Sequence, residues 1–117
     1  MTQIHLNREL LRLSALLDEA LRAMRDRGRL AAERERDYRL ARAKAWLTAE
    51  GTAGQKADEV NATTANERYA RDIAESDTKA AGEAVRNYRQ QLSCLQTISA
   101  AERAERELAR YGPEMTP

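Results

Sequence analysis

Large apolar residues recur at steps of three and four through the first fifty residues of the chain. This spacing predicts an amphipathic helix with one buried face. A glycine inside a helix costs only about 1 kcal/mol relative to alanine, so the tract over residues 1–50 is either one helix or two helices that separate near Gly28. The stripe consists of Leu10, Leu13, Leu17, Leu21 and Met24, widened by Leu6, Leu11 and Leu16.

The clearest interruption of this pattern comes at Gly51 and Gly54. Glycine suits a helix C-cap and lets the chain reverse, so we expect a turn at residues 51–54. A second helical tract is predicted over residues 55–110, and residues 111–117 are typical of a short flexible tail. The pattern therefore predicts an all-α protein, mainly a long antiparallel helical hairpin of two or three helices with coiled-coil-like packing.

The second tract carries its strongest apolar stripe near its middle. A hairpin with narrow seams buries limited surface by itself, so we expect the chain to form a homo-oligomer. Residues 55–110 would serve this association, and the predicted association seam consists of Val85, Tyr88, Leu92 and Leu95.

Asp77 lies four residues before Ala81, close to the same stripe. It could be a buried polar residue that sets register or oligomer state, as polar seam positions do in coiled coils. It could instead face water where the seam drifts. We favour the second interpretation, because buried acids are rare unless they are paired.

The composition narrows the class of protein further. The hydrophobic fraction is 42%, but 22 of those residues are alanine and none is phenylalanine. Alanine, arginine, glutamate and leucine dominate, which is typical of long paired helices and argues against a sheet protein. A single cysteine, no apolar run near 18 residues and no signal-peptide pattern at the start predict a soluble, cytoplasmic protein with no membrane partner.

Residues that could perform catalysis are few. His5 is the only histidine and lies near the start of the chain, where we expect it to be solvated. Cys94 lies between Ser93 and Leu95, and we expect it to be a small buried side chain. With no second histidine or cysteine to complete a metal site, the sequence predicts a protein that is not an enzyme and holds no cofactor.

Basic residues concentrate in one segment of the first tract. Residues 22–44 contain nine Lys or Arg and four Asp or Glu, and the basic segment extends to residue 47 with Trp46. Arginine pairs with phosphates and aromatic rings stack on unpaired bases, so this segment could bind single-stranded nucleic acid. Arg/Glu mixing on a helix is more often a solvated, salt-bridged surface, and for Trp46 taken alone we favour a position in the core over a stacking role. The candidate nucleic-acid-binding residues are Tyr38, Arg39, Arg42, Lys44 and Trp46.

Residues 38–47, followed by Gly51, resemble the basic–alanine–basic helix end, aromatic residues and glycine turn of the phage UvsY-like recombination mediators. Residues 76–95 are similar to the C-terminal oligomerisation helix of that family, and the resemblance covers about residues 5–105. It implies a helical fold, a ring of identical subunits and a phage-infected bacterial host. It also implies binding of single-stranded DNA through Arg42 and Lys44, with a recombinase and a single-strand-binding protein as partners.

Two hypotheses about function follow. The first is a non-catalytic, homo-oligomeric single-stranded DNA-binding protein that acts as a phage recombination mediator. The second is a helical scaffold, assembly chaperone or protein inhibitor that acts only through protein–protein contacts. The first requires Arg39, Arg42 and Lys44 to converge on an open face. The second hypothesis is favoured if these side chains instead pair with Glu35, Asp37 or the second tract.

Overall fold

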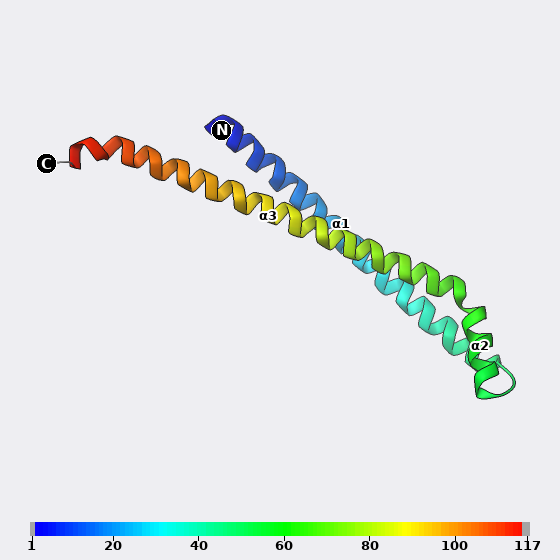
Figure 1. The fold of residues 1–117 in the computed structure, drawn as a ribbon. Coiled ribbons are helices and arrows are strands. Elements are labelled where there is room, and N and C mark those ends of the chain that lie inside the picture. The colour runs from blue at the N-terminus through cyan, green and yellow to red at the C-terminus, as the bar shows by residue number, and fades with distance from the viewer. Residues whose placement is uncertain (1, 116–117) are drawn as a thin grey trace. The chain divides into compact units, whose positions relative to one another are not determined.

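A computed structural model describes the backbone of residues 2–115 and the side chains of residues 2–111. It contains three helices, α1 (Gln3–Thr48), α2 (Ala53–Thr63) and α3 (Ala65–Met115), and no strand within the described residues (Figure 1). The predicted all-α class is therefore confirmed.

The first helix runs through Gly28 without a break, so a split of the first tract at this residue is wrong (Figure 1). A Cβ atom added at Gly28 would meet no atom within 4 Å. This glycine therefore provides neither a turn nor a close approach between helices. The neighbouring residues have good helix propensity and carry the helix across it.

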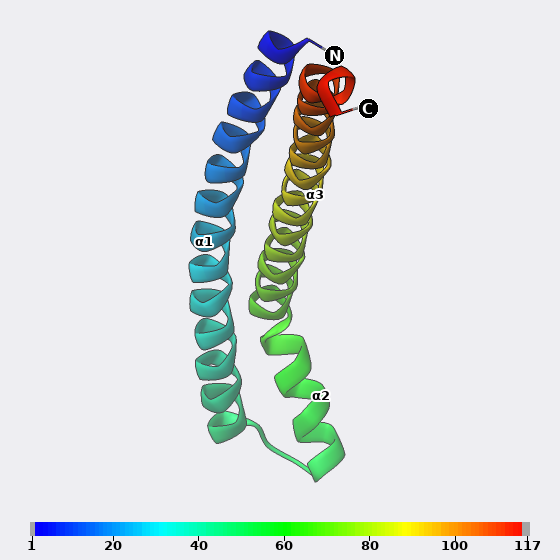
Figure 2. The same cartoon turned by 90° about the vertical axis from the view of Figure 1, so that its left-hand side faces the viewer.

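The second tract, predicted as one helix, is instead divided at Thr64. The hydroxyl and the backbone N–H of Thr64 both donate to the carbonyl oxygen of Val60, at 2.7 and 3.0 Å. Thr64 has φ −103° and ψ 13°, and a step in the ribbon separates α2 from α3 (Figure 2). Apolar spacing did not reveal this break, because the buried positions keep their steps of four and three through Thr64.

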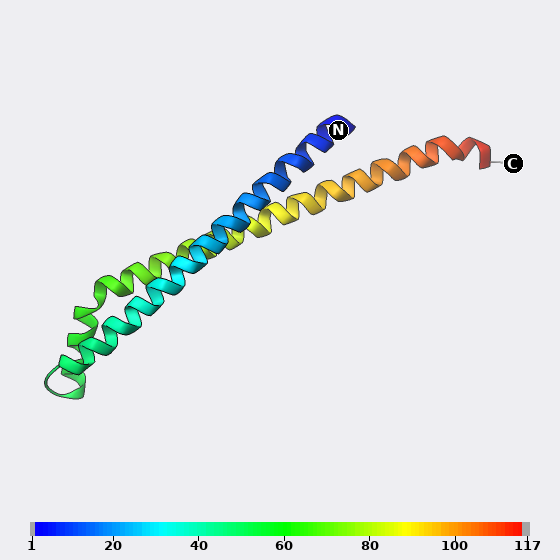
Figure 3. The ribbon, with the colours of Figure 1, turned by 180° about the vertical axis from the view of Figure 1, so that it is seen from behind.

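Residues 49–52 connect α1 to α2, so the turn lies two residues earlier than predicted (Figure 3). Gly51 has φ 108°, a left-handed conformation that favours glycine. Thr52 caps α2: its hydroxyl accepts from the N–H of Gln55 at 3.3 Å, while its own N–H donates to Gln55 Oε1 at 3.0 Å. A Cβ atom at Gly51 would overlap that same Oε1 atom. Glycine is therefore required here by both conformation and space.

The third helix continues to Met115. The flexible tail predicted for residues 111–117 therefore begins too early, since the backbone of residues 111–115 is helical. Thr116 and Pro117 lie outside the described residues.

The chain divides into two compact units, and each contains antiparallel helical segments. Unit 1 comprises Met1–Ala20 and Ala84–Pro117, and unit 2 comprises Leu21–Glu83. The core of unit 1 consists of buried Leu6, Leu13 and Leu95, with Leu10, Leu16, Tyr88 and Leu92 packed against them. A smaller cluster in unit 2 consists of Ala45, Ala49 and Val60.

Within unit 2, the buried positions of α2 and α3 follow alternating steps of four and three, the spacing of a coiled-coil seam. The seam passes through Thr78, and Asp77 next to it is exposed. The water-facing interpretation of Asp77 is therefore confirmed. The buried and half-buried seam residues are Val60, Thr64, Glu67, Arg71, Ala74, Thr78 and Ala81.

None of the helices in the described part of the chain combines the length and the apolar character needed to cross a membrane.

Candidate functional site

The five predicted nucleic-acid-binding residues all lie in the last turns of α1, within unit 2. Each residue of an α-helix turns the chain by about 100°, so two residues separated by two positions lie about 200° apart. Arg42 and Lys44 therefore project from nearly opposite sides of α1. The basic pair implied by the family resemblance does not share one face of the helix.

Two of the three predicted phosphate ligands already have partners within the chain. Nε of Arg39 donates to Glu35 Oε1 at 2.8 Å, although this arginine side chain is 77% exposed. Nη1 of Arg42 donates to Asn61 Oδ1 on α2 at 2.9 Å. These are the contacts, with Glu35 and with the second tract, that favour an interaction module over a DNA-binding face.

Tyr38 faces another cation. The guanidinium carbon of Arg71, on α3, lies 4.5 Å from the centre of the Tyr38 ring. Nη1 of Arg71 also lies 3.6 Å from Glu35 Oε2, and the Arg71 side chain is half-buried. A ring covered by a cation–π contact does not offer that face to a nucleotide base.

Arg71 was not identified from the sequence as a functional or structural residue. It occupies a seam position three residues before Ala74, and an arginine at such a position is the signal that could have revealed it. A hydrogen bond with Asp72 raises the pKa of Arg71. Partial desolvation lowers this pKa, and the negative charges of Asp72, Glu35 and Glu75 raise it. Together, Glu35, Tyr38 and Arg71 form a polar cluster that links α1 to α3 within unit 2.

Trp46 and Lys44 lie outside this polar cluster. Trp46 is exposed and is not part of the buried cluster of Ala45, Ala49 and Val60 beside it. Lys44 is exposed as well. The structure thus leaves these two side chains accessible while it engages Tyr38, Arg39 and Arg42.

The predicted association seam is filled by the chain itself. Leu95 is buried in one cluster with Leu6 and Leu13, while Tyr88 and Leu92 pack against that cluster from α3. Val85 is only 3% exposed. The periodicity correctly identified a packing stripe, but within unit 1 its partner is α1 rather than a second copy. These four side chains are therefore used for packing within the chain.

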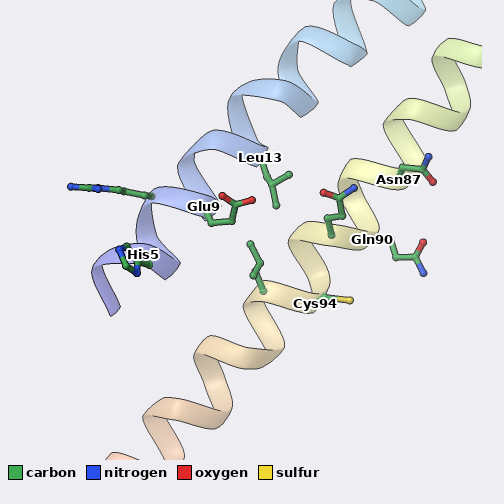
Figure 4. Close-up of a pocket in the computed structure, with 9 residues that line it drawn as sticks. His5, Glu9, Leu13, Asn87, Gln90 and Cys94 are labelled. Carbon is green, nitrogen blue, oxygen red and sulfur yellow. The ribbon is translucent and has the colours of Figure 1, made fainter. Parts of the chain in front are cut away.

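Unit 1 also contains a groove with a volume of about 730 Å³ (Figure 4). Glu9 and Leu13 of α1 project toward α3, and Leu95 contributes to the apolar lining. Polar side chains border this lining, including three amides from α3. The groove is lined by His5, Arg8, Glu9, Leu13, Asn87, Gln90, Gln91, Cys94 and Leu95.

Cys94 is exposed at this groove, so the expectation that it is buried is wrong. Its neighbour Leu95 occupies the seam, and one residue along a helix turns the side chain by about 100°. The sulfur atom of Cys94 points away from α1 (Figure 4).

Glu9, also at the groove, forms an ion pair with Arg12. Nε of Arg12 donates to Glu9 Oε2 at 3.0 Å. This hydrogen bond lowers the pKa of the Glu9 carboxyl. Desolvation opposes the shift, and the positive charge of Arg12 adds to it. Among the side chains of residues 2–111, no group of three or more His, Cys, Asp or Glu is placed to hold a metal ion.

No protein-family model, curated protein or solved structure matches this chain. The resemblance to the UvsY-like mediators therefore stays a prediction.

Proposed function

We propose that the chain is a non-catalytic helical interaction module that acts through protein–protein contacts, as a scaffold, assembly chaperone or inhibitor does. The observation that carries this proposal is the pairing of Arg39 with Glu35 and of Arg42 with Asn61. The contact of Arg42 with Asn61 joins α1 to α2, and each of these two arginines has a partner within the chain.

Exposed apolar side chains support the same proposal. Large apolar side chains are exposed in both units: Ile4, Leu11, Leu40, Leu47, Tyr69 and Leu108.

The second candidate function is single-stranded DNA binding, as a recombination mediator with a recombinase and a single-strand-binding protein as partners. It is favoured by exposed arginines at positions 22, 25, 29 and 36, whose spacing gathers them along one side of α1. Asp26 and Glu33 follow Arg22 and Arg29 by four residues, which weakens this basic stripe. The protein-contact proposal therefore ranks first.

Fluorescence anisotropy of a labelled single-stranded oligonucleotide tests the choice. The protein is titrated at low and at moderate salt, because contacts with phosphates release counterions and weaken as salt rises. The interaction-module proposal predicts no specific binding at either salt concentration. Tight, salt-sensitive binding that falls when Arg22, Arg25 and Arg29 are replaced by alanine would overturn it and establish the second candidate.

A variant that combines Arg42→Ala with Lys44→Ala tests the placement implied by the family resemblance. If this variant alone abolishes DNA binding, the DNA site lies at the end of α1. If binding is present and unaffected by it, the site lies on the arginines nearer the middle of the helix.

A further inference from the structure

An apolar stripe lies on the side of α1 that faces away from the packing seam of unit 2. Leu47 is 86% exposed and Leu40 is 53% exposed. Leu47 follows the buried Ala45 by two residues, so the two side chains project about 200° apart. We define the outer stripe as Arg36, Leu40, Ala43 and Leu47, whose spacing alternates between four and three residues. Glu50 follows the end of α1 by two residues, in the connection to α2.

We propose that two copies of this chain pair through their outer stripes, antiparallel and about a two-fold axis near Ala43. This inference rests on the proposed function and names its first partner, a second copy of the chain. In a two-fold interface, residue i contacts residue j and residue j contacts residue i. Leu40 of each copy then faces Leu47 of the other copy, and the two Ala43 residues meet at the axis.

The charges near the two ends of the outer stripe favour this antiparallel arrangement. Arg36 on α1 and Glu50, two residues beyond the end of α1, are both exposed. The antiparallel pairing that joins Leu40 to Leu47 also brings Arg36 of one copy close to the end of α1 of the other copy, where Glu50 follows. A parallel pairing would place Arg36 against Arg36 and Glu50 against Glu50, which is repulsive.

The edges of the outer stripe add one favourable and one unfavourable contact. On one edge, Arg39 of one copy comes near Trp46 of the other, in reach of a cation–π contact. On the other edge, the two Lys44 residues approach each other near the axis and repel. The outer stripe spans twelve residues, about 18 Å of helix, so the interface is a short one. These features predict a reversible dimer rather than an obligate one.

Sedimentation velocity over a wide range of protein concentrations tests the proposed surface. The wild-type chain should show a concentration-dependent equilibrium between monomer and dimer. The double variant Leu40→Asp, Leu47→Asp should raise the dissociation constant of the dimer at least about tenfold. The matched control is Leu11→Asp with Leu108→Asp, which changes two exposed leucines of unit 1 and should leave the equilibrium unchanged. Circular dichroism verifies that all variants are equally helical.

A charge exchange tests the direction of the pairing. Arg36→Glu alone and Glu50→Arg alone should each weaken the dimer several-fold, and the combined variant should restore it. Lys44→Ala should strengthen the dimer, because it removes the repulsion near the axis. If the combined variant does not restore association, the antiparallel pairing is wrong.

The outcomes separate this inference from the proposed function. A chain that stays monomeric at every concentration and binds no DNA overturns the self-pairing and leaves a module with another protein as its partner. Tight DNA binding overturns the proposed function, whether or not the chain dimerises without DNA. If the dimer persists in Leu40→Asp, Leu47→Asp but is lost in Leu11→Asp, Leu108→Asp, the proposed interface is wrong, because the chains then associate through unit 1 and not through the outer stripe.

Discussion

Arg42 on α1 donates a hydrogen bond from Nη1 to Asn61 Oδ1 on α2, over 2.9 Å. The two residues are separated by the loop that reverses the chain, and the bond lies beside the small cluster of Ala45, Ala49 and Val60. With so few apolar atoms buried there, a cross-helix hydrogen bond is a substantial part of what holds α2 against α1. A residue predicted to neutralise a phosphate thus has a structural role in unit 2.

The first prediction concerns this hydrogen bond. Arg42→Ala and Asn61→Ala should each lower the free energy of unfolding by about 0.5–1.5 kcal/mol. The double variant should lose little more than either single variant, since both remove the same interaction. Urea unfolding of the four proteins measures the coupling. Lys44→Ala is the control and should leave the free energy of monomer unfolding nearly unchanged. Additive losses at positions 42 and 61 would contradict a direct interaction.

The second prediction compares two glycines. Gly28→Ala should stabilise the protein by about 0.5–1 kcal/mol, because alanine is the better helix former and a Cβ atom meets nothing within 4 Å there. Gly51→Ala should destabilise it by about 1–2 kcal/mol, because φ is 108° and the new Cβ would displace Gln55 from the cap of α2. Thermal unfolding should show a higher melting temperature for Gly28→Ala and a lower one for Gly51→Ala than for the wild-type chain. A stable Gly51→Ala protein would mean that the turn has another conformation.

Apolar periodicity was sufficient to predict the helical class, the chain reversal near Gly51 and the packing stripe through Leu92 and Leu95. It could not predict the break at Thr64, because the threonine hydroxyl bonds to the carbonyl of Val60 without disturbing the four–three spacing of the seam. It also assigned Val85 and its neighbours to a second copy, since a periodic stripe does not specify which helix covers it.

The candidate site shows the same limitation of sequence reasoning. The residues near Tyr38 were recognised as a basic segment, but Asn61, which binds Arg42, and Arg71, which lies over the Tyr38 ring, are distant in sequence. Charge counting along the chain therefore could not reveal these two contacts, whereas the pairing of Arg39 with Glu35 lies within one turn of the same helix. The exposed position of Cys94, one residue from the seam, likewise depends on the phase of the helix to within a single residue.

The third prediction concerns the pH dependence of Glu9. Its pKa is lowered in the folded protein by the hydrogen bond from Arg12. A carboxyl with a lowered folded pKa contributes stability above its unfolded pKa, and this contribution is lost as the pH falls through the folded value. An NMR titration should therefore give Glu9 a midpoint below the ordinary value of 4.5. In Arg12→Ala the midpoint should return toward that value, and an unchanged midpoint would contradict the cause assigned here.

The last prediction tests whether Leu95 packs against helices of its own chain or against a second copy. Leu95→Ala should lower the free energy of unfolding by about 2–5 kcal/mol, because Leu95 is buried against Leu6 and Leu13 of its own chain. Leu13→Ala should cost about as much, whereas Leu11→Ala, at an exposed position, should cost little. If Leu95 packs within one chain, the difference in melting temperature between wild type and variant stays the same when the protein is diluted. If Leu95 instead formed a seam between copies, the difference would shrink on dilution, since dissociated chains would already have lost the contact.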